Sequence, residues 1–155
     1  MRKKKIPRLE WLENIPGAIK EEKRIPWPIL KKRLDDAFSD LIRMTHADDN
    51  GMVTCIDGCG RTGHWKEFDC GHFAKRDNLT TRWHLDNCRP QHPYCNRRLD
   101  GRQYEFGRAL NQESPGLADR MMALADKPGD HVRLDAEKML LEFREMLKIQ
   151  RKRFR

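Results

Sequence analysis

No stretch of the 155-residue sequence stays apolar for long enough to cross a bilayer, because charged residues and prolines break up every hydrophobic segment. The positive charges near the start are not followed by the apolar core of a secretory signal, since Arg8, Glu10 and Glu13 interrupt it. The sequence also contains no internal repeat and no low-complexity tract. These absences argue against a membrane-spanning or repeat architecture and predict a soluble, cytosolic protein.

The sequence is poor in hydrophobic residues, which form 37% of it, and rich in charged residues, which form 36%. We therefore expect a small core and a heavily charged surface, in one domain with appendages because the length leaves little room for two. Lys and Arg outnumber Asp and Glu by 32 to 24, and the excess of +8 gathers near the two ends. This asymmetry favours a polyanion such as nucleic acid as the partner, with a solvated basic tail as the alternative.

Cysteine is present in an odd number, five, and all five lie among histidines between Cys55 and Cys95. Such clustering is typical of metal binding in a reducing compartment rather than of a disulfide framework. One Cys-x3-Cys pair begins at Cys55, and one His-x2-Cys pair ends at Cys95. Zinc prefers four thiolate or imidazole ligands in a tetrahedron, and two short pairs on separate turns can supply them. The sequence therefore predicts one structural Zn²⁺ with the ligands Cys55, Cys59, His92 and Cys95.

Two cysteines stay outside this predicted quartet. Cys70 and Cys88 have no partner at ligand spacing, so we interpret both as packing residues. Either of them is an alternative fourth ligand in place of His92. A further alternative is that the cysteines are all small buried hydrophobic residues and that His92 lies at the surface.

The spacing of apolar residues predicts an α+β chain with several helices. The clearest helix covers residues 28–44, where apolar residues recur at three- and four-residue intervals. Another helix is expected to begin near Tyr94, followed by helices at 103–111, 114–124 and 135–152. Two strands are expected within 65–73 and 80–85. The predicted organisation is an extended basic arm at 1–27, one domain at 28–152 and a basic tail at 153–155.

The residues with catalytic potential lie between the two predicted zinc pairs. The run from Asp69 to Phe73 reads Asp-Cys-Gly-His-Phe, Asn87 follows, and Asn96 comes directly after Cys95. Hydrolysis of a phosphodiester needs a base that deprotonates water and a divalent metal that stabilises the developing negative charge. His72 is the candidate base.

This order of residues resembles the HNH, or His-metal finger, nucleases. Asp69 and His72 match the first motif of that family, Asn87 its middle asparagine, and Asn96 the final position, which is usually His. The resemblance implies that Asn87 fixes the loop that orients His72, and that Asp69 and Asn96 hold Mg²⁺ or Mn²⁺. It also implies a zinc-braced ββα-metal finger, similar to HNH and treble-clef folds, surrounded by α-helices.

A wider set of residues resembles the phage NinG family, also called Rap recombination proteins, over roughly residues 28–150. Its most specific elements are Gly-His-Phe at 71–73 and Gln-x3-Cys-Asn at 91–96. The other matching elements are the helix at 34–44, the segment 55–60, and the residues Arg76, Arg82, Gly101, Tyr104 and Leu110. His92 stands where that family usually has Cys, and the first cysteine pair is one residue longer than usual.

The NinG resemblance implies a structure-specific endonuclease that acts on branched recombination intermediates such as Holliday junctions and D-loops. A phage or prophage origin and action in the cytoplasm of the bacterial host follow from the same resemblance. Because symmetric cutting of a four-way junction needs two active sites, we expect a homodimer.

Arginines gather around the predicted catalytic segment. Guanidinium groups bind phosphate in pairs of hydrogen bonds, and this many in a short stretch fit a groove that follows the DNA backbone rather than one that reads bases. The predicted DNA-binding residues are Arg76, Arg82, Arg89, Arg97, Arg98 and Arg102.

Two other functions fit parts of the pattern. One is a zinc-containing module that binds branched or single-stranded DNA without cutting it. The other is an interaction protein whose C-terminal helix docks on a partner through the apolar face that includes Met139 and Met146. Each catalytic candidate also has a structural alternative: His72 as a buried histidine, Asp69 as a turn residue, Asn87 as a loop residue and Asn96 as an N-cap.

Overall fold

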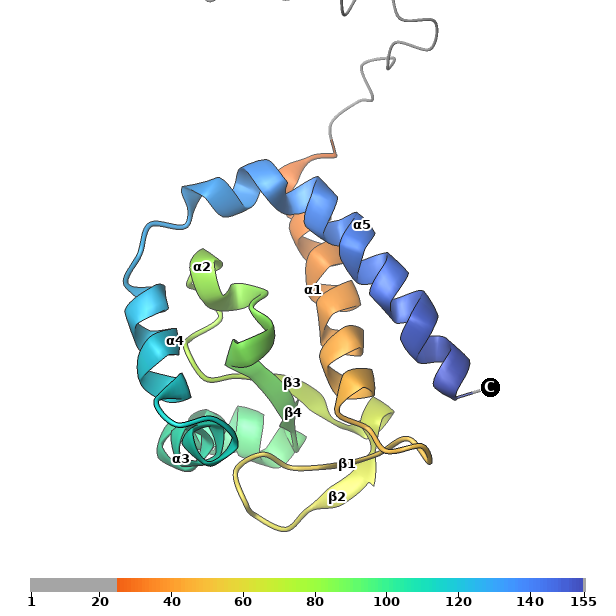
Figure 1. Cartoon of the computed structure of the whole chain (residues 1–155), viewed down its shortest axis with the longest axis vertical. Coiled ribbons are helices and arrows are strands. Elements are labelled where there is room, and N and C mark those ends of the chain that lie inside the picture. Colours follow the sequence, from red (N-terminus) through yellow and green to blue (C-terminus); the bar gives the residue numbers. More distant parts are fainter. Residues whose placement is uncertain (1–24, 155) are drawn as a thin grey trace, which may run out of the picture.

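The computed structural model describes residues 25–154, so most of the predicted arm at 1–27, and Arg155, lie outside the described residues. The fold is α+β and mostly helical, with two separate two-stranded antiparallel sheets (Figure 1). Within the described part, no helix is both long and apolar enough to traverse a bilayer. The prediction of an α+β chain is confirmed at this level.

Helix α1 spans Trp27–Thr45 and confirms the predicted helix to within one residue at each end. Pro28 stands in its first turn, where a missing N–H group costs nothing. Most of its apolar residues are buried, and helix α5, Asp130–Arg153, packs along it (Figure 1). The residues of α1 at the centre of this contact are Leu34, Phe38, Leu41 and Ile42.

The two sheets are short hairpins. Strands β1, Met52–Thr54, and β2, Thr62–His64, are joined by the loop that carries the first cysteine pair. Strands β3, Asp69–His72, and β4, Cys88–Gln91, pair so that His72 lies opposite Cys88. The candidate base therefore lies at the end of the second hairpin, beside the start of β4.

The strand predicted at 80–85 is wrong. This segment forms the short helix α2, Leu79–Arg82, because the Asn78 side chain accepts hydrogen bonds from the amides of Thr80 and Thr81 and caps it. The strand predicted at 65–73 is correct only in its second half, since a 3₁₀ turn occupies Trp65–Glu67.

The β3–β4 hairpin lies between α1 on one side and α3, Gln103–Glu113, on the other. At Gly71 an added Cβ would lie 2.5 Å from the side-chain oxygen of Gln91 and 3.1 Å from the Phe106 ring of α3. Only glycine allows this close approach, which explains the residue before His72.

The C-terminal half is helical, as expected, with different boundaries. A π-helix at Tyr94–Arg98 precedes α3, and α4 spans Leu117–Ala125. Ser114, where the predicted helix at 114–124 begins, instead ends α3. The Asn111 side chain accepts a hydrogen bond from the amide of Ala118 in α4. Helix α5 begins before the predicted position of residue 135, because Val132 is already buried in the core.

Candidate functional site

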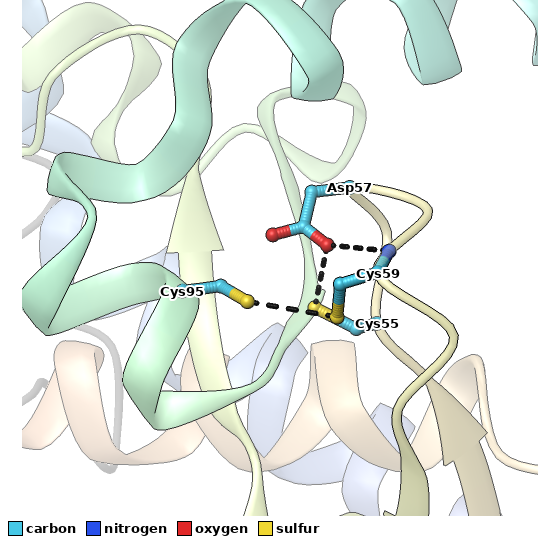
Figure 2. Close-up of side chains that lie close together, drawn as sticks. All are labelled: Cys55, Asp57, Cys59 and Cys95. Atoms are coloured by element: carbon cyan, nitrogen blue, oxygen red, sulfur yellow. Dashed lines mark hydrogen bonds between the residues drawn. The ribbon is translucent and has the colours of Figure 1, made fainter.

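Three of the four predicted zinc ligands come together in the structure. Cys55 and Cys59 belong to the loop after β1, and Cys95 comes from the π-helix. Together with Asp57 they place one ligand atom each within 4.8 Å of the others (Figure 2). The sulfur atoms of Cys59 and Cys95 are 3.5 Å apart, and Cys55 Sγ lies 3.2 Å from Asp57 Oδ1. This group could hold a metal ion such as zinc.

The buried setting of this group fits a cation. Burial raises the pKa of the Cys55 thiol far above its usual value, and burial with the neighbouring Asp57 raises the pKa of Cys95 to about 11. Burial also acts to raise the pKa of Asp57, but hydrogen bonds from the three thiols and the Cys59 amide bring it down to about 2. The Asp57 Oδ2 atom is buried and has no hydrogen-bond partner among the described residues. A cation would compensate this buried charge.

His92 is not part of this group, which corrects its predicted place beside the cysteines. Its backbone N–H donates to Cys55 Sγ at 3.1 Å, while its ring Nδ1 accepts from the amide of Tyr94 at 3.2 Å. The ring also packs edge-on against Phe68. His92 therefore contacts a thiol through its amide, and Asp57 is the fourth member of the group that could hold a metal ion.

Asp57 is not among the ligands predicted from the sequence. The residue lies inside the Cys-x3-Cys pair, where the extra residue of the loop turns its carboxylate back toward the sulfur atoms. Gly58 and Gly60 flank Cys59 with φ of +71° and +77°, a left-handed conformation that favours glycine. The unusual length of the Cys-x3-Cys pair is the one feature of the sequence that could have indicated Asp57 as a ligand.

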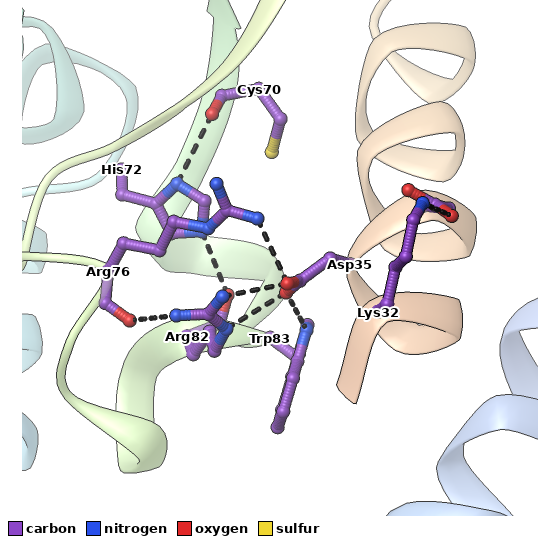
Figure 3. Close-up of polar contacts among 8 residues, drawn as sticks. Lys32, Asp35, Cys70, His72, Arg76, Arg82 and Trp83 are labelled. Atoms are coloured by element: carbon purple, nitrogen blue, oxygen red, sulfur yellow. Dashed lines mark hydrogen bonds and ion pairs between the residues drawn. The ribbon is translucent and has the colours of Figure 1, made fainter. Parts of the chain in front are cut away.

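His72 lies between two carbonyl oxygens. Its Nδ1 is 3.2 Å from the Cys70 oxygen, and its Nε2 is 3.0 Å from the Arg82 oxygen (Figure 3). Burial lowers the pKa of His72, and the positive charges of Arg76 and Arg82 lower it further. The imidazole is therefore neutral near pH 7, as a general base must be.

Asn87 holds the loop that presents the Arg82 carbonyl to His72. It is fully buried, and its Nδ2 donates to the oxygens of Ala74 and Thr81 at 3.0 Å each. Its Oδ1 accepts from the Ala74 amide at 2.7 Å. Asn87 thus joins both ends of the segment 74–81, which leads from the end of β3 into α2.

Asp69 and Asn96 also come together. The Asn96 Nδ2 donates to Asp69 Oδ2 at 2.9 Å, and Arg97 Nε donates to the same oxygen at 2.7 Å. Burial acts to raise the pKa of Asp69, but the Arg97 and Asn96 hydrogen bonds outweigh it and lower the pKa. Asp69, Asn96 and His72 line one surface pocket of about 420 Å³. An ionised carboxylate, an amide and a neutral imidazole therefore share one cavity.

Comparisons with known proteins assign no family. The sequence matches no protein-family model and no curated protein, and no solved structure matches the chain. The resemblance to HNH and NinG proteins therefore depends on the motif residues alone.

Asp35 is a pocket residue that sequence analysis overlooked. It lies on α1 and accepts hydrogen bonds from Arg82 at 2.7 and 2.8 Å and from the Trp83 indole at 2.9 Å (Figure 3). Arg76 pairs with it at 2.9 Å. Burial acts to raise the pKa of Asp35, but these partners bring it below its usual value. In the sequence Asp35 resembles a solvent-facing helix residue, and its partners lie more than 40 positions away.

The structure corrects two of the six predicted DNA-binding arginines. Arg82 is buried against Asp35, and Arg89 is buried with its guanidinium bound to Glu113 at 2.6 and 2.9 Å. Neither can reach a phosphate, because both guanidinium groups already bind carboxylates inside the fold. The other four side chains have exposed surface: Arg76, Arg97, Arg98 and Arg102.

Proposed function

We propose that this chain is a metal-dependent DNA endonuclease of the phage NinG, or Rap, recombination family, which cuts branched DNA such as Holliday junctions and D-loops. One observation carries the proposal: a neutral His72, held by the Arg82 carbonyl, shares a pocket with the oxygen ligands Asp69 and Asn96. Base, candidate metal ligands and an entrance for substrate meet in one place.

The chemistry follows from the two nitrogens of His72. With its proton on Nε2, donated to the Arg82 carbonyl, the ring keeps the lone pair of Nδ1. When a water molecule takes the place of the Cys70 carbonyl oxygen beside Nδ1, this lone pair accepts a proton from the water. The water oxygen then bonds to phosphorus, and the bond from phosphorus to the leaving sugar oxygen breaks. A positioned general base of this kind accelerates hydrolysis by about 10² to 10⁴-fold.

Asp69 and Asn96 offer the hard oxygen donors that Mg²⁺ and Mn²⁺ prefer, so the donor set fits such an ion. When bound, the ion supplies positive charge that stabilises the phosphorane oxygens and the leaving oxygen. Arg97 pairs with Asp69 and has a side chain that is 68% exposed. It is therefore free to turn from the carboxylate toward a DNA phosphate.

The cysteine group serves this site as a structural zinc centre. Cys55, Asp57, Cys59 and Cys95 form a closed set of four ligands, and a closed set favours a structural rather than a catalytic role. Three thiolates and one carboxylate carry four negative charges against two on Zn²⁺. Arg61, 3.5 Å from Cys95 Sγ, and Arg102, 3.9 Å from Asp57, offset the remainder.

The zinc centre also positions the catalytic residues. Asn96 directly follows Cys95, so a bond from Cys95 to zinc also fixes the backbone of Asn96, whose side chain contacts Asp69. In this proposal the β3–β4 hairpin and the following π-helix are the counterpart of the ββα-metal finger that the motif resemblance implies.

A cleavage assay tests the proposal. The full chain is incubated with a four-way junction, a flap and a linear duplex of matched sequence, with Mg²⁺, with Mn²⁺ or with EDTA. We expect metal-dependent nicks in the junction and little cutting of the linear duplex. Binding to the junction with no turnover in either metal would instead support a DNA-binding module without catalysis. The neutral Asn96, a weak ligand, and the Arg97 pairing of Asp69 are the features that favour this second candidate.

A further inference from the structure

A second group of potential metal ligands lies outside the zinc centre. Cys70, His72 and Cys88 place one ligand atom each within 4.8 Å of one another. In the β3–β4 ladder His72 lies opposite Cys88, and Cys70 lies two residues before His72. Side chains two residues apart project from the same face of a strand, so all three belong to the face that packs toward α1.

This arrangement suits a metal better than a disulfide. Cys70 and Cys88 are diagonal neighbours, because the partner of Cys70 in the ladder is Pro90. Diagonal residues in an antiparallel pair are about 7 to 8 Å apart, at or beyond the limit for an unstrained disulfide. The two sulfur atoms lie within 4.8 Å of each other, so a zinc ion with bonds of about 2.3 Å to each sulfur fits between them without moving the strands.

The His72 ring supplies a second reason. A neutral imidazole has one N–H, yet both of its nitrogens face carbonyl oxygens, of Cys70 and of Arg82. In either tautomer one lone pair is directed toward an acceptor. A cation that takes the place of one of these carbonyl oxygens at that nitrogen removes the conflict, and the two thiolates beside it balance the charge of the cation.

The surroundings also tolerate such a site. Two thiolates and Zn²⁺ form a neutral unit, which lowers the cost of placing it in a half-buried position. The nearby guanidinium groups of Arg76 and Arg82 both pair with Asp35, which offsets one of their two positive charges. Cys88 is fully buried, whereas Cys70 and His72 line the surface pocket, so a metal enters from the pocket and its fourth position faces solvent.

We propose that Cys70, His72 and Cys88 form a second metal site, selective for thiophilic ions such as Zn²⁺, whose occupation takes the lone pair of His72 and stops cleavage. Binding releases the two thiol protons to solvent. The site is thus an inhibitory one that competes with the base function of His72. The inhibition rests on the proposed nuclease activity, whereas the binding of metal does not.

Cobalt titration tests the binding. Metal-free full chain is titrated with Co²⁺, which gives thiolate-to-cobalt absorption when bound to cysteine. We expect two Co²⁺ per wild-type chain, and one per chain for Cys70→Ser and for Cys88→Ala. Cys55→Ser, which removes a ligand of the other centre, should keep the site at Cys88. One cobalt in the wild type, with no change in Cys70→Ser, would overturn the proposal.

Cleavage then tests the inhibition. Wild-type chain loaded with one equivalent of Zn²⁺ should cut junction DNA with Mg²⁺ present, and a second equivalent should reduce the rate at least tenfold. Cys88→Ala should keep its rate after the second equivalent. Equal inhibition of the wild type and of Cys88→Ala by the second equivalent would contradict the inhibitory role of this second metal site. Two bound cobalt ions in a chain that never cuts DNA would refute the proposed nuclease and the inhibition, and leave the metal site standing.

Discussion

The Nε2 atom of His72 lies 3.0 Å from the carbonyl oxygen of Arg82, ten residues further along the chain. In the tautomer with its proton on Nε2, the ring donates this proton to the Arg82 carbonyl and Nδ1 is the basic nitrogen. The carbonyl is in place because Arg82 is anchored to Asp35 and because Asn87 fixes the loop before it. The reactivity proposed for His72 therefore depends on residues that do not touch the substrate.

Replacing Asn87 should impair cleavage more than DNA binding. Asn87→Ala removes three buried hydrogen bonds, which should cost about 2 to 3 kcal/mol of unfolding free energy and release the loop. We expect the single-turnover rate on a junction to fall about a hundredfold, because the base is no longer oriented. Asn50→Ala, at an exposed turn, is the control. An unchanged rate in folded Asn87→Ala protein would argue against this positioning role.

Asp35 should stabilise the fold in a pH-dependent way. Asp35→Asn breaks a pair with the buried Arg82, so we expect a loss of about 3 kcal/mol by urea unfolding near pH 7. Because the folded pKa of Asp35 is lowered, this stability is fully present above the unfolded pKa and is lost as pH falls through the folded pKa. The difference between the two proteins should therefore shrink below about pH 4.

Asp36→Asn provides the matched control for Asp35. Asp36 is the next residue of α1 and pairs only with the exposed Lys32, at 2.6 Å, among the described residues. A surface pair of this kind is worth at most about 0.5 kcal/mol. Equal losses of unfolding free energy in Asp35→Asn and Asp36→Asn would show that the contacts of Asp35 stabilise the fold no more than an exposed ion pair does.

Asp57 and His92 should differ as zinc ligands. In the Cys88→Ala background, where the second site is removed, Asp57→Asn should weaken zinc binding, because a ligand with full negative charge becomes neutral. His92→Ala should keep one zinc per chain, since the amide and not the ring of His92 contacts Cys55. A chelator competition assay measures both affinities. If His92→Ala lost zinc and Asp57→Asn kept it, the result would support the ligand set predicted from the sequence, with His92 in place of Asp57.

Alanine variants of two arginines should distinguish a residue that contacts DNA from one that stabilises the fold. Arg98 is exposed, so Arg98→Ala should weaken junction binding and reduce the slope of log affinity against log salt by about one. Arg89 is buried against Glu113, so Arg89→Ala should lower the unfolding temperature. Binding by fluorescence anisotropy across salt concentrations measures the first effect. If the slope of log affinity against log salt were the same for Arg98→Ala as for the wild type, Arg98 would not contact the DNA backbone.

The sequence was sufficient for features with a local pattern. The apolar spacing of α1 predicted its length, and the two short pairs predicted that Cys55, Cys59 and Cys95 would meet. Strand β4 had no such pattern, because it contains Pro90 and buries every residue on both faces. Alternation of polar and apolar residues therefore could not reveal it.

The sequence also could not predict the roles of residues whose partners are distant along the chain. Asp35 finds its partners 47 and 48 positions away, so its role depends on how α1 packs against α2. Cys70 and Cys88 have no ligand spacing along the chain and meet only through the ladder register. Arg82 and Arg89 resembled surface arginines because their carboxylate partners, Asp35 and Glu113, are remote in sequence.

The central claim is that His72 is the general base, and its alanine variant tests it most directly. Single-turnover cleavage of a four-way junction with Mg²⁺ is compared for wild type, His72→Ala and the control His131→Ala, which alters an exposed histidine of α5. We expect all three proteins to bind the junction alike, and only His72→Ala to lose its cleavage rate, by about 10² to 10⁴-fold. Cleavage by His72→Ala at the wild-type rate would contradict this claim.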